Sequence, residues 1–442
     1  MTPHADEEHG AEDRRLKAAR RLAEEFANHL DIDVAVRLWD GSVIPLGKNG
    51  SGDLAIAFNS PGVLTSLVRW PSLDRLIRHY AHGRIDIEGG TLVEFGERIG
   101  SGETRRQLRR MSRLKLLRLA RPLLFGPADR PDTSRDFDDS QSSSSTSRQQ
   151  ATSQIQFHYD VGNAFYELFL DKQMVYSCAY FTDWSNSLDQ AQHDKLDMIC
   201  RKLRLREGDR MLDIGCGWGS LICFAAQNYG VHAVGVTLSE EQCHYARGRV
   251  ENLGLAERVE IRLQNYLDVD GSFDKIASIG MYEHVGIKNY PAYFGKIRSL
   301  LAEDGLFLNH GITRRGRRRK FRILRRPEQR AITKYIFPGG ELDDIGNSVR
   351  EMEATGLEVH DVEGWREHYA LTTRMWCDRL TANKDAAITL VGPETYRIWV
   401  AYLAGCSLSF SRGSMRIFQT VAGKSARGPS PLPPTRADLY RG

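Results

Sequence analysis

The decisive stretch reads Arg210-Met211-Leu212-Asp213-Ile214-Gly215-Cys216-Gly217-Trp218-Gly219-Ser220. A short apolar run ends at Asp213, and three glycines then occupy every second position before an apolar, helix-compatible segment from Leu221 to Tyr229. Glycine accepts positive φ angles and lets a ligand approach the backbone closely. The stretch therefore predicts a strand, a tight turn and a helix N-terminus, with the turn placed against a nucleotide-like group.

The glycine spacing restricts the kind of ligand. It follows the pattern G-x-G-x-G rather than the dinucleotide pattern G-x-G-x-x-G, and no Lys-Ser/Thr pair comes after it. A cofactor without a pyrophosphate is therefore favoured. The motif resembles the S-adenosylmethionine-binding loop of class I methyltransferases, and the alternative is a glycine-rich turn that binds no ligand.

Strands and helices alternate after this loop. We expect strands at 233–238, 259–263, 273–279 and 305–310, and helices at 239–253 and 290–301. This alternation predicts an α/β fold, a Rossmann-like sheet of mostly parallel strands with helices on both faces, as in class I methyltransferases. Ligands of such sheets bind beyond the carboxyl ends of the strands. The rule gathers these residues around one crevice: Gly215, Thr237, Gln264, Asn265, Gly280 and His310.

Length and composition set broad limits. The chain has 442 residues, enough for two or three domains, and a formal net charge of only +4 at pH 7. Its seven cysteines form no C-x-x-C pair, which is typical of reduced intracellular thiols. The first 20 residues contain no apolar signal segment, and no run of 18 apolar residues occurs. We expect a cytoplasmic protein that attaches peripherally to the inner face of the membrane.

Composition shifts divide the chain into four parts. Residues 1–126 alternate short strand and helix patterns and predict a small α+β domain that contacts lipid or membrane. Residues 127–153 are rich in Pro and Asp and then in Ser and Gln, so we expect a disordered linker. The catalytic domain is expected at 154–423, and the proline-rich end, 424–442, as a disordered tail.

Basic and apolar residues interleave from Arg105 to Leu119. At helical spacing this pattern is typical of a helix on an anionic membrane surface, where each basic residue adds on the order of 1 kcal/mol. A helix that packs its leucine side on the domain and solvates its arginine side is the alternative. Nucleic acid is disfavoured, because no aromatic residues interleave with the charges as a base-stacking surface requires.

Six motifs occur in order and carry a wider resemblance. The whole set resembles the cyclopropane-fatty-acyl-phospholipid synthase family over about residues 154–420, and more weakly its N-terminal domain. The motifs are Phe157-His158-Tyr159-Asp160-Val161-Gly162-Asn163, Tyr176-Ser177-Cys178-Ala179-Tyr180-Phe181, the glycine loop, Val234-Gly235-Val236-Thr237-Leu238-Ser239-Glu240-Glu241-Gln242, Tyr282-Glu283-His284-Val285-Gly286 and Lys334-Tyr335-Ile336-Phe337-Pro338-Gly339-Gly340.

The resemblance implies a reaction on the cis double bond of a phospholipid acyl chain. Methyl transfer from S-adenosylmethionine leaves a carbocation, and a bicarbonate ion then serves as the base whose action closes a cyclopropane ring. The implied seat of this ion consists of Cys178, Glu283, His310, the backbone at Ile312, and Tyr369. The family also implies a homodimer, and Tyr335 and Phe337 are candidates to stabilise the cation through their ring faces.

The implied cofactor-binding residues surround the glycine loop. The usual acid at the end of the second strand is absent, so hydroxyl and amide groups of Thr237, Ser239 and Gln242 must hold the sugar or amino-acid end of the cofactor. The complete set is Tyr176, Ser177, Asp213, Gly215, Gly217, Thr237, Ser239, Gln242, Gln264, Asn265 and Gly280. A metal pair at Glu283-His284 is disfavoured, because no third ligand stands at familiar spacing.

A run of basic residues, Arg314-Arg315-Gly316-Arg317-Arg318-Arg319-Lys320, departs from the family pattern. It is interpreted as a contact for phosphate headgroups or as a solvated charged face. Two alternative functions remain. One is a methyltransferase that stops at a methyl- or methylene-branched chain, and the other is a basic lipid- or RNA-binding protein on a methyltransferase scaffold without activity.

Overall fold

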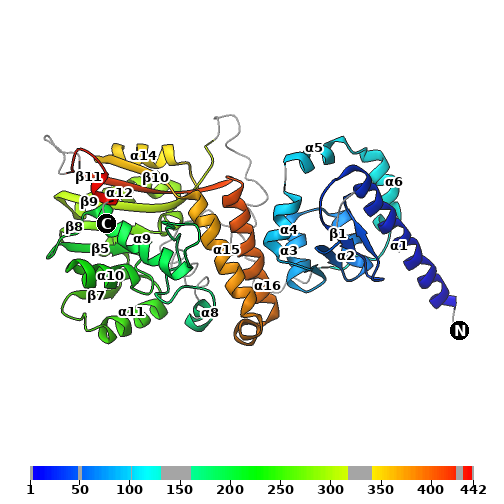
Figure 1. Ribbon diagram of the computed structural model, residues 1–442, viewed down its shortest axis with the longest axis horizontal. Helices are drawn as coiled ribbons and strands as arrows, with labels where there is room; N and C mark the ends of the chain where they lie inside the picture. The colour runs from blue at the N-terminus through cyan, green and yellow to red at the C-terminus, as the bar shows by residue number, and fades with distance from the viewer. Residues whose placement is uncertain are drawn as a thin grey trace. The chain divides into compact units, whose positions relative to one another are not determined.

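The computed structural model describes residues 3–47, 52–100, 102–130, 161–316, 341–424 and 432–440. The chain divides into two compact units (Figure 1). The first comprises residues 1–140, 325–335 and 384–408, and the second comprises 141–324, 336–383 and 409–442. Several expected features lie outside the described residues, namely the motif residues 157–160 and 334–340, the basic residues 317–320 and residues 131–153 of the expected linker.

The first unit contains a four-stranded sheet in the order β2-β1-β3-β4. The strands are β1 (Ala35–Arg37), β2 (Val43–Pro45), β3 (Ala55–Phe58) and β4 (Ile85–Glu88). The helices are α1 (Pro3–His29), α2 (Pro61–Arg69), α3 (Leu73–Ala81), α4 (Leu92–Ile99), α5 (Gly102–Arg110) and α6 (Arg113–Leu124). The unit is α+β, as predicted, but β3 was not foreseen.

Helix α16 (Lys384–Ser411) contributes residues 384–408 to this first unit. Arg397 on α16 donates hydrogen bonds to the carbonyl oxygens of Tyr80 and Ile85, at 2.5 and 2.8 Å. Its guanidinium also lies 3.2 Å from the carboxylate of Asp86. The expected assignment of all residues from 154 to 423 to the catalytic domain therefore differs from the structure at this helix.

The basic segment from Arg105 to Leu119 is two helices rather than one. Helix α5 ends at Arg110, and Ser112 accepts a hydrogen bond from the Lys115 N–H at 3.4 Å as the N-cap of α6. A serine side chain at this position satisfies an N–H group that the first helical turn leaves without a partner. The segment thus divides at Met111-Ser112.

The second unit contains a seven-stranded sheet in the order β10-β11-β9-β8-β5-β6-β7. Its strands are β5 (Arg210–Ile214), β6 (His232–Thr237), β7 (Val259–Leu263), β8 (Phe273–Ile279), β9 (Leu301–Arg314), β10 (Leu357–Gly364) and β11 (Met415–Lys424). Strands β9, β8, β5, β6 and β7 are parallel, while β11 runs antiparallel to both β9 and β10.

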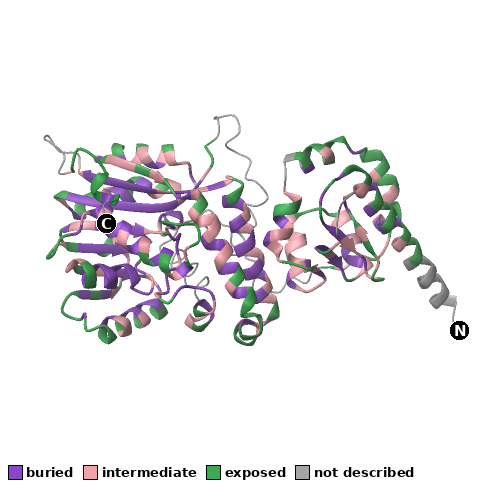
Figure 2. Cartoon of the chain, in the orientation of Figure 1, coloured by how far each residue is buried: buried purple, intermediate pink, exposed green. Residues whose placement is uncertain are grey.

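Helices cover both faces of this sheet. The helices of this unit are α8 (Asn163–Glu167), α9 (Leu188–Leu203), α10 (Ser220–Tyr229), α11 (Glu240–Asn252), α12 (Tyr290–Leu300), α14 (Ile345–Ala354), α15 (Arg366–Ala382) and α17 (Ala437–Tyr440). Successive strand residues enter opposite cores, because side chains alternate across a strand. Met211 packs with α9 and α10, whereas Leu212 packs with α12, and Figure 2 shows the central strands of the sheet mostly buried. The expected α/β class is confirmed.

Two further expectations need correction. Strand β9 continues to Arg314, because antiparallel β11 pairs with it over its whole second half, so His310 lies within the strand and not at its end. The predicted disordered tail does not hold for residues 432–440. Leu439 is 2% exposed, and Arg436 forms an ion pair with Asp361 of β10.

Among the described helices, none combines the length and the apolar character needed to cross a lipid bilayer.

Candidate functional site

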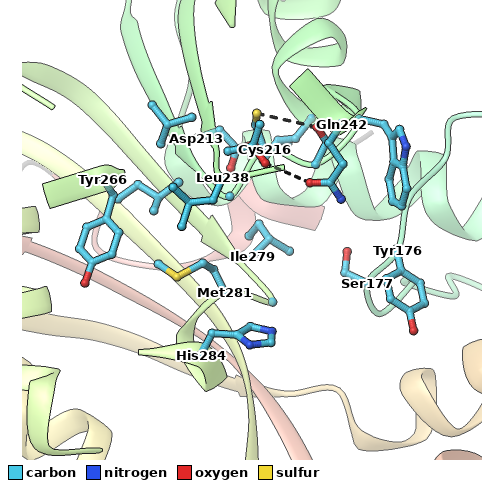
Figure 3. A pocket seen from close by; sticks show the side chains of 18 of the residues that line it. Tyr176, Ser177, Asp213, Cys216, Leu238, Gln242, Tyr266, Ile279, Met281 and His284 are labelled. Carbon is cyan, nitrogen blue, oxygen red and sulfur yellow. Dashed lines mark hydrogen bonds between the residues drawn. The ribbon is translucent and has the colours of Figure 1, made fainter. Parts of the chain in front are cut away.

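A cavity of about 410 Å³ lies where β5, β6 and β8 end, within the range of small-molecule sites. Figure 3 shows Tyr176 and Ser177 at one side, Tyr266 at the other, and Met281 and His284 near its base. Ten of the eleven predicted cofactor-binding residues line the cavity, namely Tyr176, Ser177, Asp213, Gly215, Gly217, Thr237, Gln242, Gln264, Asn265 and Gly280.

Ser239 is the exception, because its hydroxyl caps helix α11 by accepting the Gln242 N–H at 3.3 Å. His310 was expected at the same crevice but does not line it. The residue lies within β9, where its backbone carbonyl accepts the Gly280 N–H at 2.8 Å. The crevice and the predicted anion seat are therefore adjacent sites with different linings.

The glycine turn forms one wall of the cavity. The N–H groups of Gly215 and Cys216 both donate to the Val236 carbonyl, at 2.9 and 3.0 Å, and tie the turn to β6. Gly215 and Gly217 have φ angles of 81° and 55°, a region that favours glycine. A Cβ at Gly217 would meet no atom within 4 Å, so the backbone faces open space there. The predicted strand, turn and helix are confirmed.

Gln242 on α11 contacts Thr237 at the end of β6. The Thr237 hydroxyl lies 3.0 Å from the Gln242 side-chain oxygen, which can only accept, so the hydroxyl donates. The amide nitrogen of Gln242 is then directed away from Thr237, as Figure 3 shows. This geometry supplies N–H donors to a hydroxyl or carboxylate of a ligand.

Asp213 and Lys195 form a buried acidic and basic pair of cavity residues. Burial raises the pKa of Asp213 to about 7, against the opposing charge of Lys195. Burial lowers the pKa of Lys195 to about 8, and its ammonium donates to the Ser177 hydroxyl at 3.0 Å. Asp213 Oδ1 is buried with no hydrogen-bond partner among the described residues. An acceptor of this kind fits a cofactor that carries an amino group.

Sequence reasoning missed Lys195. The sequence spacing indicates that Lys195 is buried. Leu188, Lys195 and Lys202 follow one another at intervals of seven residues and lie on the buried face of α9. A lysine at a buried helical position is rarely placed there without a partner. The two lysines, like Gln192, are therefore polar exceptions on a mostly apolar face.

Glu283 belongs to a short 3-10 helix, Tyr282–His284, directly beside the cavity residues Met281 and His284. Its Oε1 accepts the Ile312 N–H at 2.5 Å, and its Oε2 is buried with no partner in the described part of the chain. Burial raises the pKa of Glu283 to about 7, and the Ile312 N–H partly opposes this rise. The Ile312 N–H, which the resemblance implies as a donor to an anion, donates to Glu283 in this structure.

His310 is completely buried. Its Nδ1 lies 2.9 Å from the Gln419 amide nitrogen, and its Nε2 has no partner within the described ranges. Burial, reinforced by the charges of Lys195 and Lys202, holds the pKa of His310 well below its usual value. The imidazole is therefore neutral at physiological pH.

Trp365 connects the remaining predicted seat residues. The Cys178 thiol lies 3.8 Å from the Trp365 carbonyl, and the Tyr369 N–H donates to the same carbonyl at 3.1 Å. The Trp365 ring contacts His310 edge to face, with centroids 5.4 Å apart. Burial raises the pKa of the Cys178 thiol well above its usual value, so this group is a neutral thiol.

The five seat residues thus form two linked groups. Glu283 pairs with Ile312, and Trp365 joins Cys178, His310 and Tyr369. His310 and Ile312 are two positions apart on β9, so their side chains share one face of the strand. The cavity residues Ser177 and His284 directly adjoin Cys178 and Glu283 along the chain.

Arg314 has partners inside the fold. Its guanidinium forms an ion pair with Asp343 at 3.0 Å, and its backbone N–H donates to the Asp343 carbonyl at 2.9 Å. The predicted contact of Arg314 with phosphate headgroups therefore competes with an internal carboxylate. Among the residues with described positions, no three His, Cys, Asp or Glu side chains gather as a metal site requires.

Comparisons with known proteins agree on one family. Residues 146–420 match the family model described as mycolic acid cyclopropane synthetase. A probable fatty acid methyltransferase of Pseudomonas putida is 39% identical over 415 residues, which are 93% of this chain and 97% of that protein. The cyclopropane-fatty-acyl-phospholipid synthase of Escherichia coli strain K12 is 41% identical over 268 residues, 60% of this chain and 66% of that protein.

A solved structure supports the same relationship. The crystal structure of mycolic acid cyclopropane synthase CmaA1 complexed with SAH and CTAB has a TM-score of 0.59 and 35% identity to this chain. The match covers 62% of this chain and 98% of that one. This chain is therefore similar in structure to nearly the whole length of that cyclopropane synthase.

Proposed function

The chain belongs to the mycolic acid cyclopropane synthetase family, and from this premise we propose that it converts cis double bonds of phospholipid acyl chains into cyclopropane rings. It is an S-adenosylmethionine-dependent methyltransferase of the cyclopropane-fatty-acyl-phospholipid synthase type. Enzymes of this type methylate fatty acyl chains or form cyclopropane rings on them. The observation that carries the finer proposal is that Glu283 Oε2 and His310 Nε2 are buried without a hydrogen-bond partner in the described part of the chain. Glu283 directly precedes the cavity residue His284, and the His310 carbonyl accepts the N–H of the cavity residue Gly280.

The cofactor would occupy the 410 Å³ cavity. S-adenosylmethionine, when bound, supplies an electrophilic methyl group on a sulfonium sulfur. The glycine turn would allow its nucleoside to approach the backbone, Gln242 would donate to its hydroxyl or carboxylate groups, and the carboxylate of Asp213 would accept from its amino group.

Bicarbonate would sit between Glu283 and His310, where it would supply the base that the methylated chain needs. A neutral His310 would donate a hydrogen bond to one oxygen of the anion, and Glu283 would accept a hydrogen bond from its hydroxyl group. Tyr369 is assigned as a further donor. The neutral Cys178 thiol adds a weak donor without a repelling negative charge.

Ring closure then follows from proton loss at the new methyl group. The electron pair of its C–H bond becomes the new C–C bond of the ring and quenches the cation on the acyl chain. Buried surroundings exclude water, which would otherwise add to that cation. The alternative, a methyl- or methylene-branched chain, has its support in the 39% identity to a probable fatty acid methyltransferase.

Product analysis distinguishes the two outcomes. Phospholipids from cells that express the protein are compared with lipids from cells with the empty vector, by mass spectrometry and proton NMR. Cyclopropane formation gives an added mass of one methylene unit with ring protons at high field. The same added mass without ring protons, and with exomethylene protons or a methyl group on a double bond, would instead establish the alternative.

We also assign contact with anionic membranes to α6. Leu114, Leu117 and Phe125 are 81%, 57% and 81% exposed, and Arg118 and Arg121 are exposed on the same face. Leucine and phenylalanine exposed beside arginine suit the interface of an anionic bilayer. The cytoplasmic location and the homodimer stay predictions, and sedimentation velocity of the purified chain would measure the oligomeric state.

A further inference from the structure

Behind His310 lies a chain of buried polar groups that the proposed reaction does not use. Gln419 on β11 is directly opposite His310 on β9 in the strand register and is 1% exposed. Its side-chain oxygen lies 2.7 Å from the ammonium of Lys202, which is itself 1% exposed. Lys202 is also paired with Glu363 and lies 4.9 Å from the centroid of the Trp365 ring.

The chemistry of these groups determines the direction of each hydrogen bond. A lysine ammonium only donates, so the Gln419 oxygen must face Lys202, and the Gln419 NH₂ group must face His310. The NH₂ group in turn donates, so Nδ1 of His310 must accept. A neutral imidazole with a bare Nδ1 carries its proton on Nε2, the atom that has no partner among the described residues.

We propose that Gln419 and Lys202 are positioning residues that hold His310 in the tautomer with the proton on Nε2. This assignment makes His310 a hydrogen-bond donor and excludes it as the general base. The identity of the anion that receives this hydrogen bond rests on the proposed function, but the tautomer itself does not. Burial and the nearby Lys195 and Lys202 charges oppose a second proton on the ring.

The two sides of the seat then have complementary roles. His310 Nε2 presents a donor, and Glu283 Oε2 presents an acceptor once it is ionised. A bicarbonate ion offers both an anionic oxygen and a hydroxyl group, so each finds a partner of opposite character. In the other tautomer, a lone pair on Nε2 would face the anion and repel it.

The tautomer can be read directly by NMR of the full-length protein with ¹⁵N-labelled histidine. Long-range ¹H–¹⁵N correlation distinguishes protonated from bare ring nitrogens, and His310→Gln assigns the signals by their loss. We expect a bare Nδ1 and a protonated Nε2 in the native chain, without any added ligand. A protonated Nδ1 with a bare Nε2 would overturn the proposal.

Variants test the cause of this preference. In Gln419→Glu, a carboxylate accepts from both neighbours, so Nδ1 of His310 should gain a proton. Gln227→Glu, on the exposed face of α10, is the matched control and should leave the His310 signals unchanged. An unchanged Nδ1 in folded Gln419→Glu would contradict the role of Gln419, and the native spectrum decides the tautomer if that variant does not fold.

Two substitutions of Lys202 test its role, one that removes the ammonium group and one that keeps a positively charged donor. Lys202→Met leaves the Gln419 amide free to rotate, so both tautomers should be populated and kcat should fall about 10- to 100-fold. Lys202→Arg retains a group that only donates and should restore one tautomer and most of the rate. The Kd for S-adenosylmethionine should remain within about twofold in each variant. Equal spectra for Lys202→Met and the native chain would count against the proposal.

The tautomer of His310 and the formation of cyclopropane are measured independently. The expected tautomer in a chain that forms no cyclopropane would retain the positioning role and reject the reaction. Cyclopropane formation by a chain whose His310 carries its proton on Nδ1 would retain the reaction and reject the positioning role.

Discussion

Glu283 is the residue whose replacement tests the anion seat most sharply. In Glu283→Gln the Ile312 N–H keeps an oxygen acceptor, but the buried Oε2 position can become an amide donor that opposes the hydroxyl of bicarbonate. We expect ring formation to fall by roughly 100-fold or more, in the range for loss of a positioned acid or base. The Kd for S-adenosylmethionine, measured by calorimetry, should stay near the native value.

Glu257→Gln is the matched control, because Glu257 is exposed on the surface of the same unit. It removes the same charge and should leave the rate unchanged. A native rate in Glu283→Gln would mean that Glu283 is not part of the anion seat.

The same residue links stability to pH. Burial raises the pKa of Glu283 from 4.5 to about 7, so the folded chain binds more protons than the unfolded chain between these values. The free energy of unfolding therefore falls as pH rises from about 4.5 to 7, by up to about 3 kcal/mol for this group. Glu283→Gln should have a higher Tm than the native chain at pH 8 and a similar Tm near pH 4.5. A Tm difference independent of pH in calorimetric scans would show that Glu283 is not the titrating group.

Helix α6 is the element through which membrane contact can be tested. Replacing Leu114 and Leu117 by serine removes two exposed side chains, each contributing about 1.5–3 kcal/mol when buried. We expect at least tenfold weaker binding to vesicles of phosphatidylglycerol and phosphatidylcholine, measured by co-sedimentation. Val43→Ser, at a half-exposed position on β2 of the same unit, is the control and should bind like the native chain. Equal binding by the double variant and the control would exclude α6 as the contact.

Elements with local signals were predictable, and elements that depend on distant partners were not. The glycine turn and β6 follow from glycine spacing and apolar runs, which need no knowledge of the rest of the chain. Strand β11 is defined by antiparallel pairing with β9, and the Gln419–His310 contact spans 109 residues. No local pattern marks such a pair. The extension of β9 past His310 was missed for the same reason.

In the candidate site, too, residues with local sequence signals were predictable, and residues that depend on distant partners were not. The rule that ligands bind beyond the carboxyl ends of parallel strands predicted five residues that line the cavity, namely Gly215, Thr237, Gln264, Asn265 and Gly280. The buried lysines Lys195 and Lys202 were not predicted, because a lysine within a helix usually extends to solvent. Their partners, Ser177 and Gln419, come from separate elements and become apparent only in the folded chain.

At the scale of the whole molecule, the chain returns to its first unit late in the sequence. Arg397 on α16 is bound to the carbonyls of Tyr80 and Ile85 and to Asp86, which hold the start of β4. A segment more than 300 residues away in sequence therefore completes a unit that begins at the N-terminus. The first unit cannot be treated as an independent N-terminal module, although composition alone suggested one.

Arg397→Ala tests whether α16 stabilises the first unit. The substitution leaves two carbonyls and one carboxylate without their donor, which costs about 2–4 kcal/mol when charge-assisted bonds are lost. We expect faster hydrogen exchange in β4 and α3, measured by mass spectrometry, while exchange in β5 and β6 stays native because these strands belong to the second unit. Arg206→Ala, at an exposed position before β5, is the control and should change neither region. Equal acceleration in both units would mean that they unfold together, and native exchange in β4 would show that Arg397 does not stabilise the first unit.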